Sequence, residues 1–159
     1  MLKQVQYDKD MTFKQKVYQH FLSLINERIN ALQTTLDELS ESAKNETKST
    51  AGDKHETALA MLQIEQANTR LKITEAIEQK TQLQTIDITL KSHKIIKGSV
   101  IKTSKGYFFL SVALGKSLID NTSVISISLQ SPLGAKLLGL KENDIVEVNG
   151  IKYAIESIL

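Results

Sequence analysis

The chain has 159 residues, of which 41% are hydrophobic and 24% are charged. Its 20 Lys+Arg and 18 Asp+Glu give a formal net charge of +2, which is too small to indicate nucleic-acid binding on charge alone. The chain contains no cysteine, which excludes disulfides, thiolate nucleophiles, cysteine-based zinc sites and iron–sulfur clusters. Length and composition predict one domain or two small units rather than a large enzyme core.

The first ten residues bear on where the protein is expected to work. They contain Lys3, Asp8, Lys9 and Asp10 and no continuous apolar stretch, so neither a signal peptide nor a membrane-spanning helix fits them. We therefore expect a soluble cytoplasmic protein that does not contact membranes.

A long helix is predicted over residues 18–43. Its apolar side chains recur at alternating intervals of four and three residues, which places them in one stripe along a helix. The stretch contains neither Gly nor Pro. The predicted stripe consists of Tyr18, Leu22, Ile25, Ile29, Leu32, Leu36, Leu39 and Ala43.

A polar turn and a second helix follow. Residues 42–52 are rich in the turn formers Asn, Ser, Thr and Gly, and the second helix is predicted to begin near Asp53. We expect the two helices to fold back on each other as an antiparallel hairpin domain over residues 1–85, which projects with its tip near residues 44–56. The second stripe is less regular than the first and consists of Ala58, Leu62, Ile64, Ala67, Leu71, Ile73, Ile77 and Leu83.

The second half of the chain, residues 86–159, is predicted to be mostly strand. Its apolar residues alternate with polar ones, and β-branched residues are frequent. Lys105-Gly106 and Asn149-Gly150 are hairpin turn signals, and the second is typical of a type I′ turn. The strand candidates are residues 99–103, 107–112, 117–120, 124–128, 145–148 and 151–155.

One short helix interrupts these strands. Ser131 is its expected N-cap, Pro132 its first helical residue and Gly139 its C-terminal stop. The fold class is therefore α+β, in which a helical hairpin precedes a small antiparallel sheet domain with one short helix.

The predicted tip holds the sharpest candidate for a functional site. Asp53 and Glu56 are three residues apart at the start of the second helix, so they share a face. Two carboxylates can ligate a divalent cation, but hard cations take about six oxygens, so this pair can only complete a site supplied by another molecule. The same spacing fits a capping box, in which both side chains only stabilise the helix end. The spacing alone leaves both interpretations open.

The layout and two motifs resemble the Gre family of bacterial transcript-cleavage and elongation factors. The tip motif of the family, Gly-Asp-x-x-Glu-x-Ala, is matched by Gly52, Asp53, Glu56 and Ala58. A C-terminal signature, Ser-Pro-(Ile/Leu)-(Ala/Gly) followed by Leu, Gly and an acidic turn, is also matched. The residues that match it are Ser131, Pro132, Leu133, Gly134, Leu137, Leu138, Gly139 and Asp144. The resemblance implies that the sheet domain is FKBP-like.

The resemblance also implies that the protein is not an enzyme but an accessory factor of RNA polymerase. The hairpin would enter the secondary channel, where Asp53 and Glu56 help to hold the polymerase's second catalytic Mg²⁺ while the polymerase cleaves a backtracked transcript. The sheet domain would dock on the channel rim through Ser131 and Pro132. The implied partners are RNA polymerase, the transcript 3′ end and, as a further candidate, DNA of the elongation complex. The protein would need no cofactor of its own and no small-molecule substrate.

Three other functions remain open. A Gre-like protein can occupy the channel as a regulator without stimulating cleavage. A coiled-coil adaptor would bind a partner helix through the hairpin, and its tip acids would act only as caps. A peptidyl-prolyl isomerase is suggested by the FKBP-like fold alone, which does not imply function. Its pocket needs converging aromatics, for which the second half offers only Tyr107, Phe108, Phe109 and Tyr153.

Overall fold

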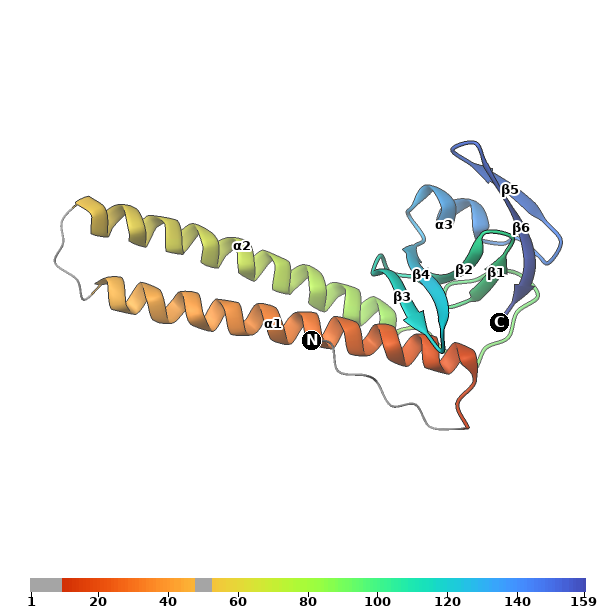
Figure 1. The fold of residues 1–159 in the computed structure, drawn as a ribbon, viewed down its shortest axis with the longest axis horizontal. Helices are drawn as coiled ribbons and strands as arrows, with labels where there is room; N and C mark the ends of the chain where they lie inside the picture. Colours follow the sequence, from red (N-terminus) through yellow and green to blue (C-terminus); the bar gives the residue numbers. More distant parts are fainter. Residues whose placement is uncertain (1–9, 48–52) are drawn as a thin grey trace. The chain divides into compact units, whose positions relative to one another are not determined.

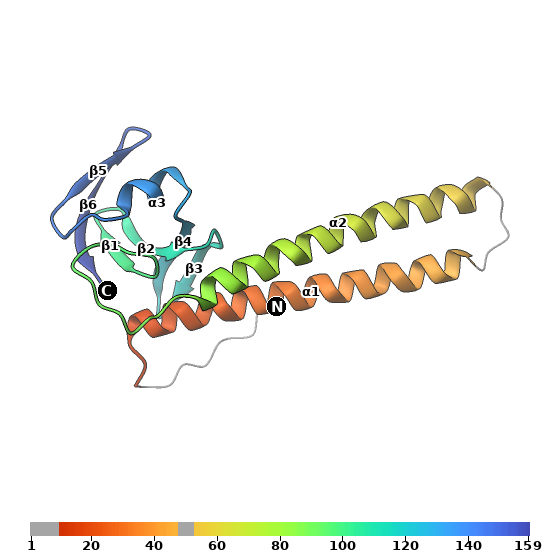
Figure 2. The same ribbon diagram turned by 180° about the vertical axis from the view of Figure 1, so that it is seen from behind.

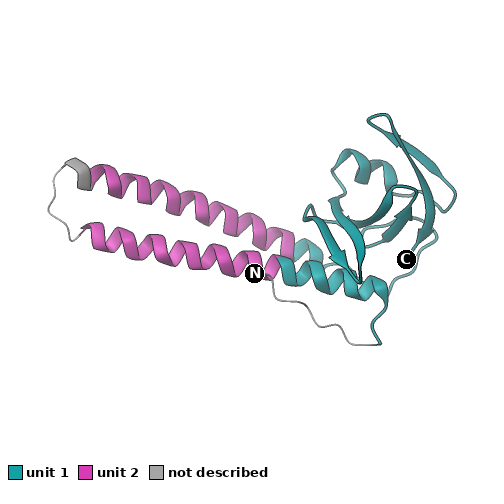
Figure 3. Ribbon diagram, viewed as in Figure 1, with its two compact units in different colours: residues 1–24, 81–159 teal, residues 25–80 magenta. Residues whose placement is uncertain are grey.

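The structure, a computed structural model, describes residues 10–47 and 53–159, although it leaves the side chains of residues 53–55 undescribed. Contacts divide the chain into two units (Figure 3). Unit 1 comprises the described residues of 1–24 together with 81–159, and unit 2 comprises those of 25–80. In the part of the chain that is described, no helix is both long enough and apolar enough to cross a membrane.

Two long helices form the first half of the chain. Helix α1 spans Phe13–Thr47 and helix α2 spans Asp53–Gln84. Helix α1 begins with a capping box, in which the Thr12 N–H donates to Gln15 Oε1 at 2.8 Å and the Gln15 N–H donates to Thr12 Oγ1 at 3.2 Å. Within unit 2 the two helices run antiparallel and side by side (Figures 1 and 2). The predicted antiparallel pairing of two long helices is confirmed, while residues 48–52 of the predicted tip lie outside the described residues.

The predicted stripe of α1 is confirmed over residues 25–43, where each of its members is at least half-buried. In the first turns the buried positions are shifted by one residue. Val17 and Phe21 are fully buried, whereas the expected Tyr18 and Leu22 are only partly buried. The shift arises because these turns belong to unit 1 and pack against the sheet as well.

The predicted stripe of α2 is partly wrong. Ile64, Leu71 and Ile77 are 61%, 60% and 48% exposed, and Ala67 is exposed as well. A different set recurs at alternating intervals of three and four residues and is at least half-buried throughout. This set, the inner stripe, consists of Leu59, Leu62, Gln66, Thr69, Ile73, Ala76, Lys80 and Leu83. Three of its members are polar, so a prediction based on hydrophobicity does not identify it.

The second half forms one six-stranded sheet in the order β3-β4-β2-β1-β6-β5, with one short helix. The α+β class is therefore confirmed. The elements are β1 (Val100–Thr103), β2 (Gly106–Ser111), β3 (Gly115–Ile119), β4 (Thr122–Ser128), α3 (Pro132–Leu137), β5 (Ile145–Val148) and β6 (Ile151–Ile158). Helix α3 packs beside β4 and β5 (Figures 1 and 2).

One strand pair departs from the predicted antiparallel sheet. Strands β2 and β4 are parallel, while the other four pairs are antiparallel. The chain reverses twice between β2 and β4, the second time at a turn in which Asp120 and Asn121 have φ of 48° and 61°. This is the positive-φ geometry of a type I′ turn. The predicted type I′ turn at Asn149-Gly150, with φ of 52° and 79°, is confirmed.

Strand β2 is buried on both faces, which explains its nearly continuous apolar sequence. On one face Phe109 stacks on Phe21 of α1, with ring centroids 5.8 Å apart and an interplanar angle of 27°. On the other face Leu110 belongs to the main apolar cluster of the sheet domain. The other buried members of that cluster are Ile95, Ile101, Leu137 and Ile155. The base of α1 and helix α3 therefore pack on opposite faces of this strand.

Candidate functional site

The predicted metal-assisting pair lies at the start of α2. Asp53 is the first residue of the helix, but its side chain lies outside the described part of the structure, as does Gly52. Glu56 stands in the first turn of α2 and is exposed. The structure thus describes one member of the pair, and the metal-assisting and capping interpretations both stay predictions.

Two of the charges that are described at the tip, those of Lys44 and Glu56, match the dipoles of their helices. Lys44 lies exposed in the last turn of α1, where a cation is favoured, and its carbonyl accepts a hydrogen bond from Thr47 Oγ1 at 2.7 Å. Glu56 lies near the N-terminus of α2, where an anion is favoured. Among the described residues no group of three or more His, Asp and Glu side chains can hold a metal. A hard cation takes about six oxygens, so Glu56 can supply only a small part of its ligand shell.

Ser131, a predicted docking residue, is the N-cap of α3. Its hydroxyl donates to the Ser128 carbonyl at 2.7 Å and accepts from the Gly134 N–H at 3.0 Å. The hydroxyl is therefore occupied by the fold itself. Pro132 occupies the first turn and is exposed, so it is the member of this pair whose ring is available to another molecule.

The glycine of the same signature has a steric cause. A Cβ at Gly134 would lie 2.0 Å from the Ser128 carbonyl oxygen and 2.8 Å from Ser131 Oγ, so no larger residue fits without movement of the backbone. Three residues later, Leu137 is fully buried in the apolar cluster. The Ser-Pro-x-Gly segment therefore builds a tight corner between β4 and the core.

The end of the signature makes one contact with the segment before β1 and closes one turn. The Gly139 N–H donates to the Ile95 carbonyl at 2.8 Å from a backbone with a φ of 86°. The Asp144 carboxylate accepts from the Lys141 N–H at 2.8 Å. Ser131 and Asp144, the polar side chains of the signature, therefore both have a role in folding.

The aromatic residues that an isomerase pocket would need do not converge. They form three separate ring pairs, namely Phe13 with Tyr107 at 5.4 Å, Phe21 with Phe109 at 5.8 Å and Phe108 with Tyr153 at 5.8 Å. Two of the pairs join β2 to different turns of α1, and the third joins β2 to β6.

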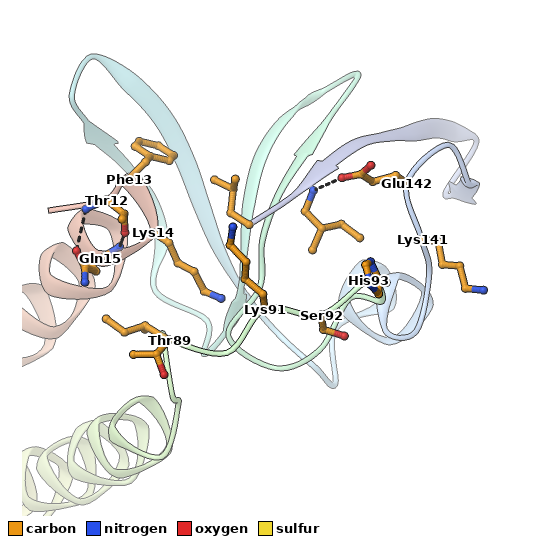
Figure 4. A pocket seen from close by; sticks show the side chains of 13 residues that line it. Thr12, Phe13, Lys14, Gln15, Thr89, Lys91, Ser92, His93, Lys141 and Glu142 are labelled. Carbon is orange, nitrogen blue, oxygen red and sulfur yellow. Dashed lines mark hydrogen bonds between the residues drawn. The ribbon is translucent and has the colours of Figure 1, made fainter.

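The structure adds a pocket that the sequence reading missed (Figure 4). Its volume is about 830 Å³, and it lies within unit 1 between the first turn of α1, the segment before β1, the turn before β5 and the end of β6. The lining residues are Thr12, Phe13, Lys14, Gln15, Ile88, Thr89, Lys91, Ser92, His93, Lys141, Glu142, Ile158 and Leu159.

The charged side chains of this pocket are mostly cationic. Burial lowers the pKa of Lys14 below its usual 10.5, the charge of Asp87 raises it and that of Lys91 lowers it further. The Lys14 ammonium donates to the Leu90 carbonyl at 3.0 Å. Such a lining favours an anionic group. Lys14 is a sequence signal for this pocket. It lies in the first helical turn after the capping box at Thr12, where helices usually carry an acidic residue.

Comparisons with known proteins give few matches. No family model matches the chain, and no curated protein matches it. One solved structure to which the chain is similar is described as the structure of the transcription factor Gfh1. The two are 16% identical with a TM-score of 0.32, and the match covers 89% of this chain and 90% of the other. At these values, the function has to be inferred from the chain's own residues.

Proposed function

We propose that this chain is an accessory transcription elongation factor that enters the secondary channel of RNA polymerase and stimulates the polymerase's own cleavage of backtracked transcripts. One observation carries the proposal. Asp53 begins α2 and Glu56 stands exposed in its first turn, at the connected end of two helices of 35 and 32 residues. The Gre resemblance implies this placement for a metal-assisting pair.

The dimensions of unit 2 suit an element that carries a carboxylate into a channel. At about 1.5 Å per residue, residues 25–47 of α1 extend roughly 35 Å and residues 53–80 of α2 roughly 40 Å. Each helix is about 10 Å across, so the pair is a slender rod with Glu56 near one end.

The chemistry of the tip requires a partner that already holds a metal. Glu56 and Asp53 can contribute a few oxygens and orient a water, but they cannot form a complete Mg²⁺ site. A polymerase active centre supplies the remaining ligands, and its Mg²⁺ supplies the activation of water and the stabilisation of the leaving oxygen. In this proposal the chain changes the rate of a reaction that the polymerase performs.

Docking on the channel rim is assigned to the corner at α3. Pro132 is exposed and Leu138 is 47% exposed, so this corner offers an apolar surface. Ser131 contributes by fixing the corner, since its hydroxyl is bonded within the chain.

The test is transcript cleavage in backtracked complexes of the cognate polymerase with Mg²⁺. We expect the wild type to stimulate cleavage and Asp53→Ala/Glu56→Ala to lose it while still binding the polymerase. The matched control is Glu38→Ala/Glu41→Ala, which removes two exposed acids from α1 and should cleave like the wild type.

Two results would contradict the proposal. Cleavage that survives the loss of both tip acids would leave Asp53 and Glu56 as helix caps, and failure of the wild type to bind would remove the polymerase as a partner. Binding without stimulated cleavage would instead support the second candidate, a channel-occupying regulator. The exposed cation of Lys44 at the tip favours that candidate, because it weakens the acidic character of the tip.

A further inference from the structure

Helix α2 carries a second apolar stripe on its exposed side. Its members recur at intervals of four and three residues, and all of them are exposed. This outer stripe consists of Ala60, Ile64, Ala67, Leu71 and Thr74. Met61 beside it is 63% exposed. The Thr74 hydroxyl donates to the Arg70 carbonyl at 3.1 Å, so this polar group is already bonded to its own helix.

The outer stripe lies opposite the inner stripe. Each of its members precedes a member of the inner stripe by two residues, as Ile64 precedes Gln66, and two residues on a helix are about 200° apart. The inner side faces α1, as the hydrogen bond from Gln66 to Ser40 shows. No large apolar side chain of the described part of α1 is among the exposed ones. The uncovered apolar surface of unit 2 therefore lies on α2.

The charges beside the outer stripe show which occupant fits it. In heptad terms Ile64 and Leu71 are a positions, Ala60 and Ala67 are d positions, and the flanking g and e positions decide orientation and partner. Position g holds Gln63 and Arg70, and position e holds Met61, Asn68 and Glu75.

We propose that two copies of this chain pair through their outer stripes as a short parallel coiled coil. In parallel pairing, each g residue faces the e residue of the next heptad on the other helix. Arg70 then meets Glu75 of the second copy, Gln63 meets Asn68, and each contact occurs twice. Antiparallel pairing would place g beside g, so Arg70 would meet Gln63 and the ion pairs would be lost. The parallel arrangement makes this surface complementary to itself.

The composition of the outer stripe makes this pairing weak. Each copy contributes two large aliphatic side chains at a positions, and the d positions hold alanine and threonine. Small interfaces of this kind belong to transient complexes. Self-association should therefore be reversible and depend on concentration. This pairing is independent of the proposed function, because it requires no property of a polymerase.

Sedimentation velocity over a concentration series tests the pairing. We expect the sedimentation coefficient of the wild type to rise with concentration, and that of Ile64→Gln/Leu71→Gln to stay at the monomer value. Both side chains are exposed, so the variant should keep its helicity, which circular dichroism checks. The control is Ile145→Gln, which removes a 68% exposed side chain from the sheet domain and should associate like the wild type. A wild type that is monomeric throughout, or a double variant that still associates, would overturn the proposal.

Cross-linking tests the parallel register in a chain with no cysteine of its own. Ala60→Cys should form a disulfide-linked dimer under mild oxidation, because the two d positions face each other. Antiparallel pairing would put Ala60 opposite Leu71, eleven residues or about 16 Å along the helix, and no such dimer would form. Thr34→Cys, an exposed position on α1, measures collisional cross-linking. Cross-linking at Ala60 that does not exceed this background would overturn the parallel arrangement.

A charge exchange tests the ion pair separately. Arg70→Glu and Glu75→Arg should each abolish the rise in sedimentation coefficient, because each sets like charges against one another. The combined Arg70→Glu/Glu75→Arg variant should restore it. Failure of the exchange to restore association would contradict the contact between the two residues.

Discussion

The side-chain amide of Gln66 on α2 donates a hydrogen bond to the hydroxyl of Ser40 on α1, and the two atoms are 3.4 Å apart. This polar contact lies within the stripe that joins the two helices of unit 2. A buried polar layer in a helix pair sets the register of the helices and lowers their stability. We infer that Gln66 fixes how the two helices align.

The first prediction concerns that polar layer. Gln66→Leu/Ser40→Ala should raise the stability by about 1–2 kcal/mol, since an apolar side chain replaces a partly satisfied amide. For a chain of this size each kcal/mol raises Tm by about 2–4 °C. Thermal unfolding followed by circular dichroism measures the shift. Gln82→Leu, at an exposed position of α2, should leave Tm unchanged, and an equal rise in that control would refute the explanation.

The second prediction concerns the corner at α3. Ser131→Ala should lower the free energy of unfolding by about 1 kcal/mol, the usual cost of a lost N-cap. Gly134→Ala should cost about 3 kcal/mol, because its Cβ would collide with the Ser128 carbonyl. Urea unfolding gives both values. The exposed Ala135→Ser should stay within about 0.5 kcal/mol of the wild type, and a Gly134→Ala chain as stable as this control would contradict the steric account.

The third prediction concerns the ring pair that joins α1 to β2. Phe21→Leu and Phe109→Leu each keep an apolar side chain and remove one ring of the stack. In a double-mutant cycle their effects should differ from additivity by about 1 kcal/mol, which is the contribution of an aromatic pair beyond its buried area. Effects that simply add would show that the stacking contributes nothing of its own.

The fourth prediction concerns Asp87. Hydrogen bonds from the Thr89 hydroxyl and the Thr89 N–H hold the pKa of the Asp87 carboxyl below its usual 3.8. The stability that this carboxylate contributes is present above pH 3.8 and is lost as the pH falls through the lower folded pKa. Thr89→Val removes the side-chain bond and should raise the pKa of Asp87 in an NMR titration. Thr89→Ser keeps a hydroxyl and should preserve the low pKa; an unchanged pKa in the valine variant would contradict the assignment.

The fifth prediction concerns Lys14 in the pocket. Its folded pKa lies below 10.5 mainly because of burial, so the folded state binds fewer protons than the unfolded state between that pKa and 10.5. The free energy of unfolding should rise with pH in this window. Below the window Lys14 is charged in both states, and the burial of that charge lowers the free energy of unfolding. Lys91→Ala should raise the pKa of Lys14, and Asp87→Asn should lower it further. Titration of the lysine side chain by NMR measures both shifts, with Lys105→Ala as the variant that should change nothing.

The sequence predicted the elements of the fold well where a single signal dominates. The stripe over residues 25–43 of α1 was readable because every member is apolar. Helix α2 carries two stripes on opposite sides of the same stretch of sequence. The stripe predicted from the sequence therefore combines Leu62 and Ile73 of the inner stripe with Ile64 and Leu71 of the outer one. Polar members such as Gln66 are half-buried because they face the partner helix, and the hydrophobicity of the sequence does not reveal which side of α2 faces α1.

Two further misses have a common physical origin in long-range contacts. The parallel pairing of β2 with β4 arises because β4, and not the next strand β3, lies beside β2, and no local sequence pattern reveals this choice of neighbour. The pocket brings Lys14 together with Lys141 from the other end of the chain, and no local pattern links them. At the tip, the sequence proposed Asp53 and Glu56, and the exposure of Glu56 is what the structure adds.

The stripes of α1 and α2 repeat every seven residues, and unit 2 begins and ends within those two helices at residues 25 and 80. Removal of one heptad from each helix would therefore leave both stripes aligned and unit 1 unchanged. Each helix would be shorter by about 10 Å. The length of the hairpin can therefore change in steps of one heptad per helix, in evolution or by design, without changes to the sheet domain.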